Sequence, residues 1–381
     1  MALQSKLPAV GTTIFTVMSK MAQDHGAINL SQGFPDFDCP ARLRELVGRH
    51  LNGGRNQYPP MAGIPELREQ IAVKVADLYG VNADPDQEVT VTSGATEALF
   101  DAVQACVGRG DEVIVFDPAY DSYGPAIELA GGKAVHIPLT LPDYAIDWNR
   151  VEAALTDRTR LIIINSPHNP CGAIIQYGDL EVLAGLVRDR DIRVLSDEVY
   201  EHMVFDGQRH HSVLSHPELR QRSFAVFSFG KTYHATGWKI AYCVAPPELT
   251  TEFRKVHQFV TFTTSSFVQY GLADFMRECP EHAVELPAFY QQKRDLFCRL
   301  IEGSRFQIRP SRGTYFQLAD YAAISDRSDM DFVTWMTREK GVAAIPLSPF
   351  YEQAPDTRII RFCFCKDDST LEQAAEILCA L

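Results

Sequence analysis

The chain has 381 residues, of which 46% are apolar and 22% are charged, and its formal net charge is −13 at pH 7. This length exceeds that of one compact core of usual size, so we expect two domains. The negative charge repels a polyphosphate backbone, and no run of Lys and Arg forms a basic stripe. Nucleic acid and anionic membranes are therefore not expected as partners.

Neither an export signal nor a membrane span is expected. The first twenty residues lack an unbroken apolar stretch and a cleavage site, and no apolar run approaches the length that crosses a bilayer. The nine cysteines show no paired CxxC spacing, which predicts reduced cysteines in the cytoplasm. Cys363 and Cys365 would face one side of an apolar strand and could hold a metal there. A buried strand is the favoured interpretation, so no metal site is predicted.

The predicted elements change in style along the chain. The first 45 residues, rich in Pro and Gly around Gln32–Phe37, show little regular pattern, and we expect them to complete a small domain or the mouth of a site. From about residue 88, short β-branched apolar runs alternate with turns and amphipathic stretches, which indicates a mostly parallel sheet covered by helices. Seven strands are predicted, at 88–92, 113–116, 133–138, 161–164, 193–196, 224–227 and 240–244.

After about residue 280 the pattern becomes one of long charged helices, predicted at 288–302, 330–340 and 369–378. Short strand-like pieces such as 313–318 lie between them, which indicates an α+β arrangement. The predicted fold is therefore α/β, with a large domain at 46–280 that holds the seven-stranded sheet. A smaller α+β domain would combine 1–45 with 281–381.

In open α/β sheets ligands bind beyond the carboxyl ends of the strands, so we expect the site residues directly after the predicted strands. The first predicted strand leads into Ser93–Phe100, where small residues open a helix whose free amides could hold a phosphate. A plain helix start with Ser93 or Thr96 as its cap explains the same segment.

Three further strand ends carry polar residues. The strand at 161–164 ends in a turn rich in Pro and Asn that contains Asn169, and the strand at 193–196 is followed by Asp197 and Tyr200. The strand at 224–227 is followed by Ser228, Lys231 and, further on, Lys239. Taken singly, these residues are explained by a tight loop, a helix cap and surface lysines.

The conjunction of these strand ends fits one cofactor, pyridoxal phosphate. Its aldehyde needs an amine, its pyridine nitrogen needs a carboxylate to stay protonated, and its phenolic oxygen needs hydrogen-bond donors. The strand ends supply all of these groups: a lysine amine, an aspartate carboxylate, and an asparagine and a tyrosine as donors. They also supply a phosphate cradle and a serine. The sequence therefore predicts a pyridoxal-phosphate site at this edge of the sheet.

The chain resembles the class I/II aminotransferases of fold type I, and within them the methionine, kynurenine and glutamine transaminase branch. The segments that carry the resemblance run from Gly11–Phe15 and Asn29–Phe37, through the strand ends above, to Arg361–Phe364. They span nearly the whole length of the chain, and their order is more specific than any one of them. The resemblance also implies a homodimer.

The resemblance implies a role for each matching residue. Lys231 would carry the cofactor as a Schiff base, Asp197 would pair with the pyridine nitrogen, and Asn169 and Tyr200 would contact the phenolic oxygen. The remaining cofactor contacts would come from Gly94, Ala95, Thr96, Tyr120, Ser228, Lys239 and, across the dimer interface, Tyr58. The substrate would be bound by Arg361, whose guanidinium fork matches a carboxylate, together with Asn169, Gly33 and Phe15.

The implied reaction moves an amino group by ping-pong kinetics. The amino acid would displace Lys231, whose freed amine would move a proton from the substrate Cα to the cofactor C4′, and a 2-oxo acid would accept the amino group in the second half. Aromatic residues dominate the expected substrate side (Phe15, Phe34, Tyr58, Tyr120 and Phe262), and no second arginine is placed for a distal carboxylate. Apolar, thioether or aromatic L-amino acids are thus favoured over aspartate.

Two alternatives stay open. The first is a pyridoxal-phosphate-dependent β-lyase that splits cysteine conjugates, because removal of the same Cα proton leads to elimination when the β-substituent is a good leaving group. The second is a non-catalytic regulatory protein on the same shell. Metal-hydrolase and nucleotide-binding motifs (HExxH, GxSxG, a P-loop and a strand-linked GxGxxG) are missing from the sequence.

Overall fold

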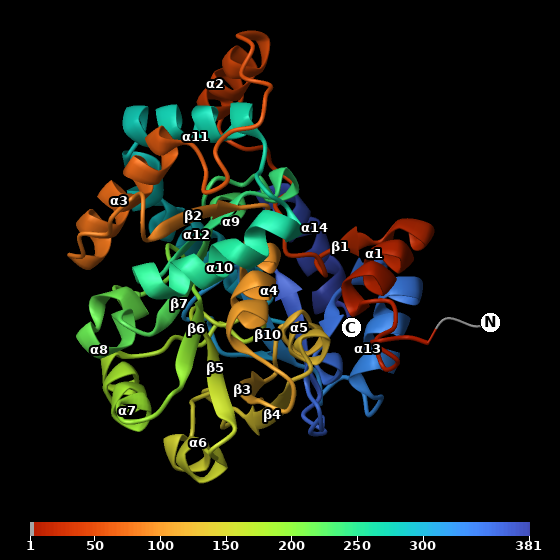
Figure 1. The fold of residues 1–381 in the computed structure, drawn as a ribbon. Coiled ribbons are helices and arrows are strands. Elements are labelled where there is room, and N and C mark those ends of the chain that lie inside the picture. The colour runs from red at the N-terminus through yellow and green to blue at the C-terminus, as the bar shows by residue number, and fades with distance from the viewer. Residues whose placement is uncertain (1–3) are drawn as a thin grey trace.

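A seven-stranded sheet forms the centre of the computed structural model, which describes residues 4–381 (Figure 1). Its strand order is β2-β8-β7-β6-β5-β3-β4. The strands are β2 (Val89–Thr92), β3 (Glu112–Asp117), β4 (Lys133–Pro138), β5 (Thr159–Asn165), β6 (Arg193–Asp197), β7 (Ser223–Ser228) and β8 (Ala241–Val244). All seven predicted strands are confirmed, with ends that differ by one or two residues.

The pairing directions place the polar strand ends at one edge of the sheet. Neighbours among β4, β3, β5, β6 and β7 are parallel, whereas β8 is antiparallel to both β7 and β2. β2 therefore runs in the same direction as the parallel strands. The carboxyl ends of β2, β5, β6 and β7 consequently meet at a common edge, as the sequence predicts.

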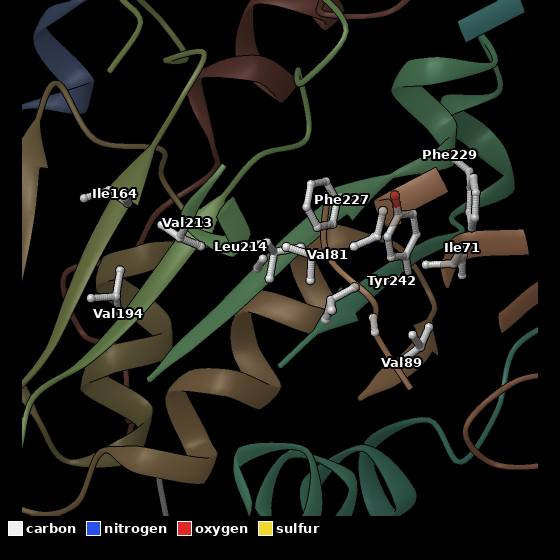
Figure 2. Packing of buried hydrophobic residues seen from close by; sticks show 14 of the residues in the cluster. Ile71, Val81, Val89, Ile164, Val194, Val213, Leu214, Phe227, Phe229 and Tyr242 are labelled. Carbon is white, nitrogen blue, oxygen red and sulfur yellow. The ribbon is translucent and has the colours of Figure 1, made fainter. Parts of the chain in front are cut away.

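Apolar residues alternate between the two faces of this sheet. On β7, Ala225 and Phe227 pack into one buried cluster, while Phe224 and Val226 pack into the cluster on the opposite face. Figure 2 shows part of the first cluster, in which the rings of Phe227 and Tyr242 stack with their centroids 5.0 Å apart. Both faces are covered, which explains why the strands are apolar runs rather than alternating sequences. Truncation of Phe227 to Ala would cost about 3–5 kcal/mol of stability.

Helices cover both faces of the sheet and extend beyond it (Figure 1). Up to residue 300 the helices of eight or more residues are α1 (Ile14–His25), α2 (Ala41–Asn52), α3 (Pro65–Tyr79), α4 (Ala95–Cys106), α5 (Tyr123–Ala130), α7 (Tyr177–Val187), α10 (Pro247–Val260), α11 (Ser266–Glu278) and α12 (Glu281–Leu300). Shorter ones are α6 (Trp148–Ala154), α8 (Pro217–Arg220) and α9 (Phe229–Thr232). Helices α13 (Asp329–Trp335) and α14 (Asp368–Cys379) follow.

The C-terminal part combines helices with two small sheets. One pairs β1 (Ile28–Asn29) with β11 (Val342–Ala343), and the other has the order β12 (Ile345–Pro346), β13 (Ile359–Cys363), β10 (Phe316–Asp320) and β9 (Gln307–Ile308). A third apolar cluster joins α1 and Leu30 to α12, α13, α14, β10 and β13. The N-terminal segment thus packs with the C-terminal part, whereas the division into domains and their boundaries stay a prediction.

Two expectations about helices were wrong. The segment before residue 46 is not irregular throughout, because it contains α1. This helix is capped at its start by Thr13, whose side chain accepts from the Thr16 amide, and at its end by Gly26 with φ +61°. Helix α12 begins at Glu281 rather than at residue 288, since it continues through Pro287 instead of starting after it. The predicted helix at 330–340 is α13 followed by a π-helical turn, Met336–Lys340.

No helix within residues 4–381 is long and apolar enough to cross a membrane.

Candidate active site

The common edge of the sheet carries a cavity of about 230 Å³. Tyr58, Phe34 and Phe262 lie outside it, and the other predicted site residues line it: Phe15, Gly33, Gly94, Ala95, Thr96, Tyr120, Asn169, Asp197, Tyr200, Ser228, Lys231, Lys239 and Arg361. These residues come from segments more than 300 positions apart in sequence, so the fold brings the predicted set together.

A buried carboxylate forms the base of the cavity. Asp197 is the last residue of β6 and is 3% exposed, and its Oδ2 accepts a hydrogen bond from the Tyr123 hydroxyl at 2.7 Å. Burial raises the pKa of Asp197 to about 6, although the hydrogen bond from Tyr123 opposes the shift. A protonated ring nitrogen at this position would restore the ionised form, because an opposite charge offsets the cost of desolvation.

A partly buried lysine lines the same cavity. Lys231 lies in α9, directly after β7, and its Nζ donates to the Tyr315 hydroxyl at 2.7 Å and to the Gly33 carbonyl at 3.3 Å. Burial lowers the pKa of Lys231 to about 8, and the positive charges of Lys239 and Arg361 act in the same direction. A larger fraction of this amine is therefore neutral near pH 7 than of an exposed lysine, which suits a nucleophile and a base.

The start of α4 forms an anion cradle. Gly94 precedes α4 with φ +87°, and a Cβ at this position would meet Cε and Nζ of Lys239 at 3.1 Å. Glycine thus lets the ammonium of Lys239 approach the free amides of Ala95 and Thr96, and Ser228 lines the same part of the cavity. A helix N-terminus, an ammonium and a hydroxyl together suit a phosphate group.

A buried guanidinium also lines the cavity. Arg361 lies on β13 and is 0% exposed; its Nη1 donates to Asn169 Oδ1 at 2.7 Å and its Nη2 to the Ser31 carbonyl at 3.0 Å. Its Nε has no hydrogen-bond partner, and the group lies 3.8 Å from the Phe316 ring centroid. Burial lowers the pKa of Arg361, so the charge is poorly compensated, and a substrate carboxylate would supply both the missing acceptor and the missing charge.

The comparisons with known proteins agree with this geometry. The family model of the class I and II aminotransferases matches residues 25–378. The chain belongs to this family. It is 53% identical to the methionine aminotransferase of Escherichia coli K12 over 98% of the chain and 97% of that protein. It is also 33% identical to human kynurenine–oxoglutarate transaminase 1, with 94% of the chain and 93% of that protein covered.

Solved structures extend the similarity to the fold of the aminotransferase. The crystal structure of an Escherichia coli protein with a methionine aminotransferase function has a TM-score of 0.98, with 53% identity and full coverage of both chains. A Thermus thermophilus aspartate aminotransferase mutant has a TM-score of 0.90 at 29% identity and covers 100% of this chain and 99% of its own. The predicted family, fold type I, transaminase class and cofactor, pyridoxal 5′-phosphate, are confirmed.

The residues of the aminotransferase cavity fit this cofactor. The cradle at Gly94 leaves the space that a phosphate needs, the buried Asp197 lacks a cationic partner among residues 4–381, and Lys231 supplies an amine in the same cavity. The alternative of a non-catalytic protein on the same fold finds no support, because the lysine, the carboxylate and the cradle are all retained.

The rim of the cavity differs from its interior. Tyr120 contacts Thr96, with 3.4 Å between the two hydroxyl oxygens, and its ring meets that of Tyr123 edge-on at 5.6 Å. Tyr58 is 85% exposed and packs its ring edge-on against Phe262, with 5.6 Å between centroids. In the single chain Tyr58 therefore does not line the cavity of the aminotransferase.

Sequence reasoning missed two buried tyrosines of the aminotransferase site. Tyr123 bonds to Asp197, and Tyr315 bonds to Lys231. Tyr123 follows Tyr120 by three positions in one aromatic segment, and the sequence does not show that its hydroxyl meets Asp197. Tyr315 lies inside a run predicted as a strand. Only the tertiary contacts distinguish these hydroxyls from ordinary core aromatics.

A buried charge cluster lies beside the cradle of the aminotransferase. His257 Nδ1 is 2.6 Å from Glu97 Oε1 and 3.6 Å from Asp101 Oδ2, and its Nε2 is 3.0 Å from the Met61 carbonyl. Glu97 also accepts a hydrogen bond from the Ser93 amide, immediately before Gly94. Burial alone would lower the pKa of His257, but Asp101 and Glu97 outweigh burial and raise it to about 9, which makes the ring an imidazolium.

Proposed function

We propose that this aminotransferase uses methionine and related apolar or aromatic L-amino acids as donors, with a 2-oxo acid as acceptor. The observation that carries the proposal is the 53% identity with the methionine aminotransferase of Escherichia coli over nearly the whole length of both chains. The cavity supports it. Its lining cations among the described residues are Lys231 and Lys239 near the cofactor and a single arginine, Arg361.

The aromatic lining supports the same donor class. Phe15 and Phe316 flank Arg361, with its guanidinium carbon 5.3 Å and 3.8 Å from their ring centroids. A carboxylate on Arg361 would therefore leave the substrate side chain near apolar surface rather than near a second positive charge. An aspartate side chain would lose its hydration there without a partner, which disfavours it as a donor.

We also propose the role of each residue in holding the cofactor. Lys231 would bind it covalently, Asp197 would hold the pyridine nitrogen, and Asn169 and Tyr200 would contact the phenolic oxygen. The phosphate would lie among Gly94, Ala95, Thr96, Ser228 and Lys239, with Tyr58 of a second copy above it and Tyr120 against the ring. When bound, pyridoxal phosphate supplies an electron sink that acidifies the substrate Cα–H.

The chain's own residues would then orient the substrate and move one proton. Arg361 and Asn169 would fix the carboxylate, while Phe15 and Gly33 would border the side chain at the mouth. Once displaced by the substrate, Lys231 would take the Cα proton at Nζ, because its burial already favours the neutral amine. The same amine would act in the return half with a 2-oxo acid, so ping-pong kinetics are expected.

A homodimer is part of the proposal. Tyr58 is 85% exposed and packs against Phe262, which is 42% exposed, so this aromatic pair lies open on the surface of the single chain. A second copy would cover this surface and bring its own Tyr58 to the cradle. We further propose domain boundaries near residues 45 and 280. A cytoplasmic location is proposed as well, supported by nine free cysteines.

The function is tested by giving the purified protein single donors with a fixed 2-oxo acid. Methionine is expected to give its oxo acid with transfer of the amino group, and phenylalanine, kynurenine and glutamine rank the side-chain preference. Aspartate should be the poorest donor, and aspartate turnover exceeding that of methionine would refute the proposal. Pyruvate and ammonia released from a cysteine conjugate, with no transfer to the oxo acid, would favour the β-lyase instead.

A further inference from the structure

A tyrosine hydroxyl contacts the amine of Lys231. Tyr315 lies directly before β10 and is 0% exposed, and its Oη lies 2.7 Å from Lys231 Nζ. The same hydroxyl is within hydrogen-bond distance of the Gly33 carbonyl, which also accepts from Lys231 at 3.3 Å. Tyr315, Gly33 and Lys231 thus form a closed set of three contacts from three distant parts of the chain.

The position of this hydroxyl is fixed by its surroundings. The Tyr315 ring lies edge-on to Tyr200 and Phe316, with centroid distances of 5.2 Å and 4.9 Å, and it is tilted against Tyr290 at 5.8 Å. Its backbone carbonyl accepts from the Phe364 amide at 3.0 Å. The ring therefore cannot turn away without disturbing a packed aromatic cluster.

The direction of the hydrogen bonds follows from the partners. A tyrosine has one hydroxyl proton, and the Gly33 carbonyl can only accept, so Tyr315 donates to Gly33 and accepts from Lys231. Burial raises the pKa of Tyr315 well above its ordinary value of 10, so the phenol stays neutral. The hydroxyl can hold the amine of Lys231 but does not remove its proton.

We propose that Tyr315 is a positioning residue that, together with the Gly33 carbonyl, holds the freed amine of Lys231 during proton transfer. The inference rests on the proposed role of Lys231. When Nζ takes the Cα proton through its lone pair, it becomes an ammonium with three N–H bonds. Tyr315 and Gly33 accept two of them, which leaves the third for delivery of the proton.

The Tyr315→Phe variant tests this role, because it keeps the ring and removes only the hydroxyl. The kcat is expected to fall roughly 10- to 100-fold, the value of a hydrogen bond to a charged group, while the KM of the donor changes less than about threefold. A Cα-deuterated donor should show a larger isotope effect on kcat in the variant, because proton transfer becomes more fully rate-limiting.

A second measurement uses the cofactor-free protein and needs no turnover. The pH dependence of Lys231 modification by an amine-reactive reagent, read by peptide mass spectrometry, reports the pKa of that amine. Because the hydroxyl accepts a hydrogen bond from the ammonium, its removal should lower the midpoint by about one pH unit. A loss of ring packing alone would not lower the midpoint for Lys231, because Phe keeps the ring.

Tyr290→Phe is the matched control. Its ring packs against Tyr315, but its hydroxyl contacts His234 Nδ1 at 2.9 Å rather than Lys231. We expect kcat within about twofold of the wild type and an unchanged Lys231 midpoint for this variant. Equal losses in both variants, or a wild-type kcat and midpoint in Tyr315→Phe, would overturn the role of Tyr315.

The absorbance band of the bound cofactor separates the two proposals. The band should be present in the wild type and in Tyr315→Phe. Its absence from the wild-type protein loaded with pyridoxal phosphate would overturn the role of Lys231 and the inference with it. A normal band with unchanged kinetics and midpoint in Tyr315→Phe would overturn the inference alone.

Discussion

The base and the rim of the cavity are built in opposite ways. At the base, Asp197 and Tyr315 are 3% and 0% exposed and are fixed by hydrogen bonds within the chain. At the rim, Tyr58 is 85% exposed and packs against Phe262, which has a backbone φ of +70°, an uncommon conformation for a residue with a side chain.

The difference shows which properties one chain determines by itself. Burial perturbs the pKa values of Asp197 and Lys231, so the chemistry of the base is set before any ligand binds. The rim has no such constraint, and in our proposal a second copy covers it. We therefore expect the reaction type to depend on the base, and cofactor retention and side-chain preference to depend more on the rim.

Asp197→Asn should have the largest effect. Loss of the buried charge beneath the cofactor is expected to lower kcat by roughly 10²- to 10³-fold. In the cofactor-free protein the same substitution should raise the stability of the fold at neutral pH. The folded-state pKa of Asp197 lies near 6, above its ordinary value of 3.8, so ionisation between pH 4 and 6 destabilises the empty fold. The variant should thus gain on the order of 1–3 kcal/mol at pH 7.5 and little at pH 4.

Thermal unfolding of the cofactor-free proteins at the two pH values checks this sign. Asp117→Asn is the control, because Asp117 is also buried but bonds to His136 Nδ1 at 2.8 Å and should lose stability on substitution. If Asp197→Asn were less stable than the wild type at pH 7.5, burial of the ionised Asp197 would cost less stability than we infer.

Arg361→Lys should have the next largest effect. A lysine keeps the charge but loses the planar fork, so kcat/KM for methionine should fall roughly 10- to 150-fold. Steady-state kinetics check this, with Arg358→Lys as a control. Arg358 precedes β13 and pairs with Asp356 through Nε at 2.9 Å on the surface. An equal loss of kcat/KM in both variants would contradict the proposal that Arg361 binds the substrate carboxylate.

Tyr58 tests whether the rim is completed by a second copy. Tyr58→Ala should lower cofactor affinity about tenfold through loss of one hydrogen bond to the phosphate. At a cofactor concentration too low to fill the Tyr58→Ala sites, mixing this variant with Lys231→Ala should restore activity to roughly a quarter of the wild type, because a mixed dimer would hold one intact site out of two.

The restoration depends on which chain supplies Tyr58. If Tyr58 served the site of its own chain, the mixed dimer would hold no intact site and the mixture would remain as impaired as its parts. Tyr177→Ala replaces an exposed tyrosine on α7 and is the control for loss of a surface ring. It should leave cofactor affinity unchanged.

His257, which lies beside the cradle, should have the smallest effect on turnover. Its pKa is raised to about 9 in the folded state, so its contribution to stability is complete below its ordinary 6.5 and is lost as pH rises through 9. Glu97 and Asp101, the acids that face it, stay ionised between pH 7 and 9.5. Denaturant unfolding across this range should show a loss of about 1–3 kcal/mol in the wild type.

The His257→Gln variant should be less stable than the wild type at pH 7 and should lack this alkaline loss. Loss of the imidazolium leaves two buried carboxylates without a cation, which explains the lower starting stability. A parallel alkaline decline in both proteins would place its cause elsewhere. His50→Gln is a partly exposed control, since His50 bonds to Asp274 at 2.7 Å.

The central sheet could be predicted because its strands are short β-branched runs with polar ends. The N-terminal helix was missed although Ile14, Met18 and Ala22 repeat every four residues on one buried face, since nearby Pro and Gly suggested a loop. The start of α12 was missed because Pro287 lies within the helix, where proline is usually excluded.

The site could be predicted where a strand end supplies a distinctive residue. Lys231, Asp197 and Asn169 each follow a strand, so sheet topology brings them together. Tyr123 and Tyr315 could not be predicted, because their roles depend on which buried group each hydroxyl meets. The charge cluster around His257 was missed for the same reason, as its members lie on two helices 160 residues apart.

The covalent attachment of the cofactor is the most direct test of the account. Borohydride treatment of the protein loaded with pyridoxal phosphate converts a lysine–cofactor bond into a stable amine, which peptide mass spectrometry then locates. The account predicts the added mass on Lys231 alone. Attachment to Lys239, which faces the same cradle, or to no lysine would contradict it.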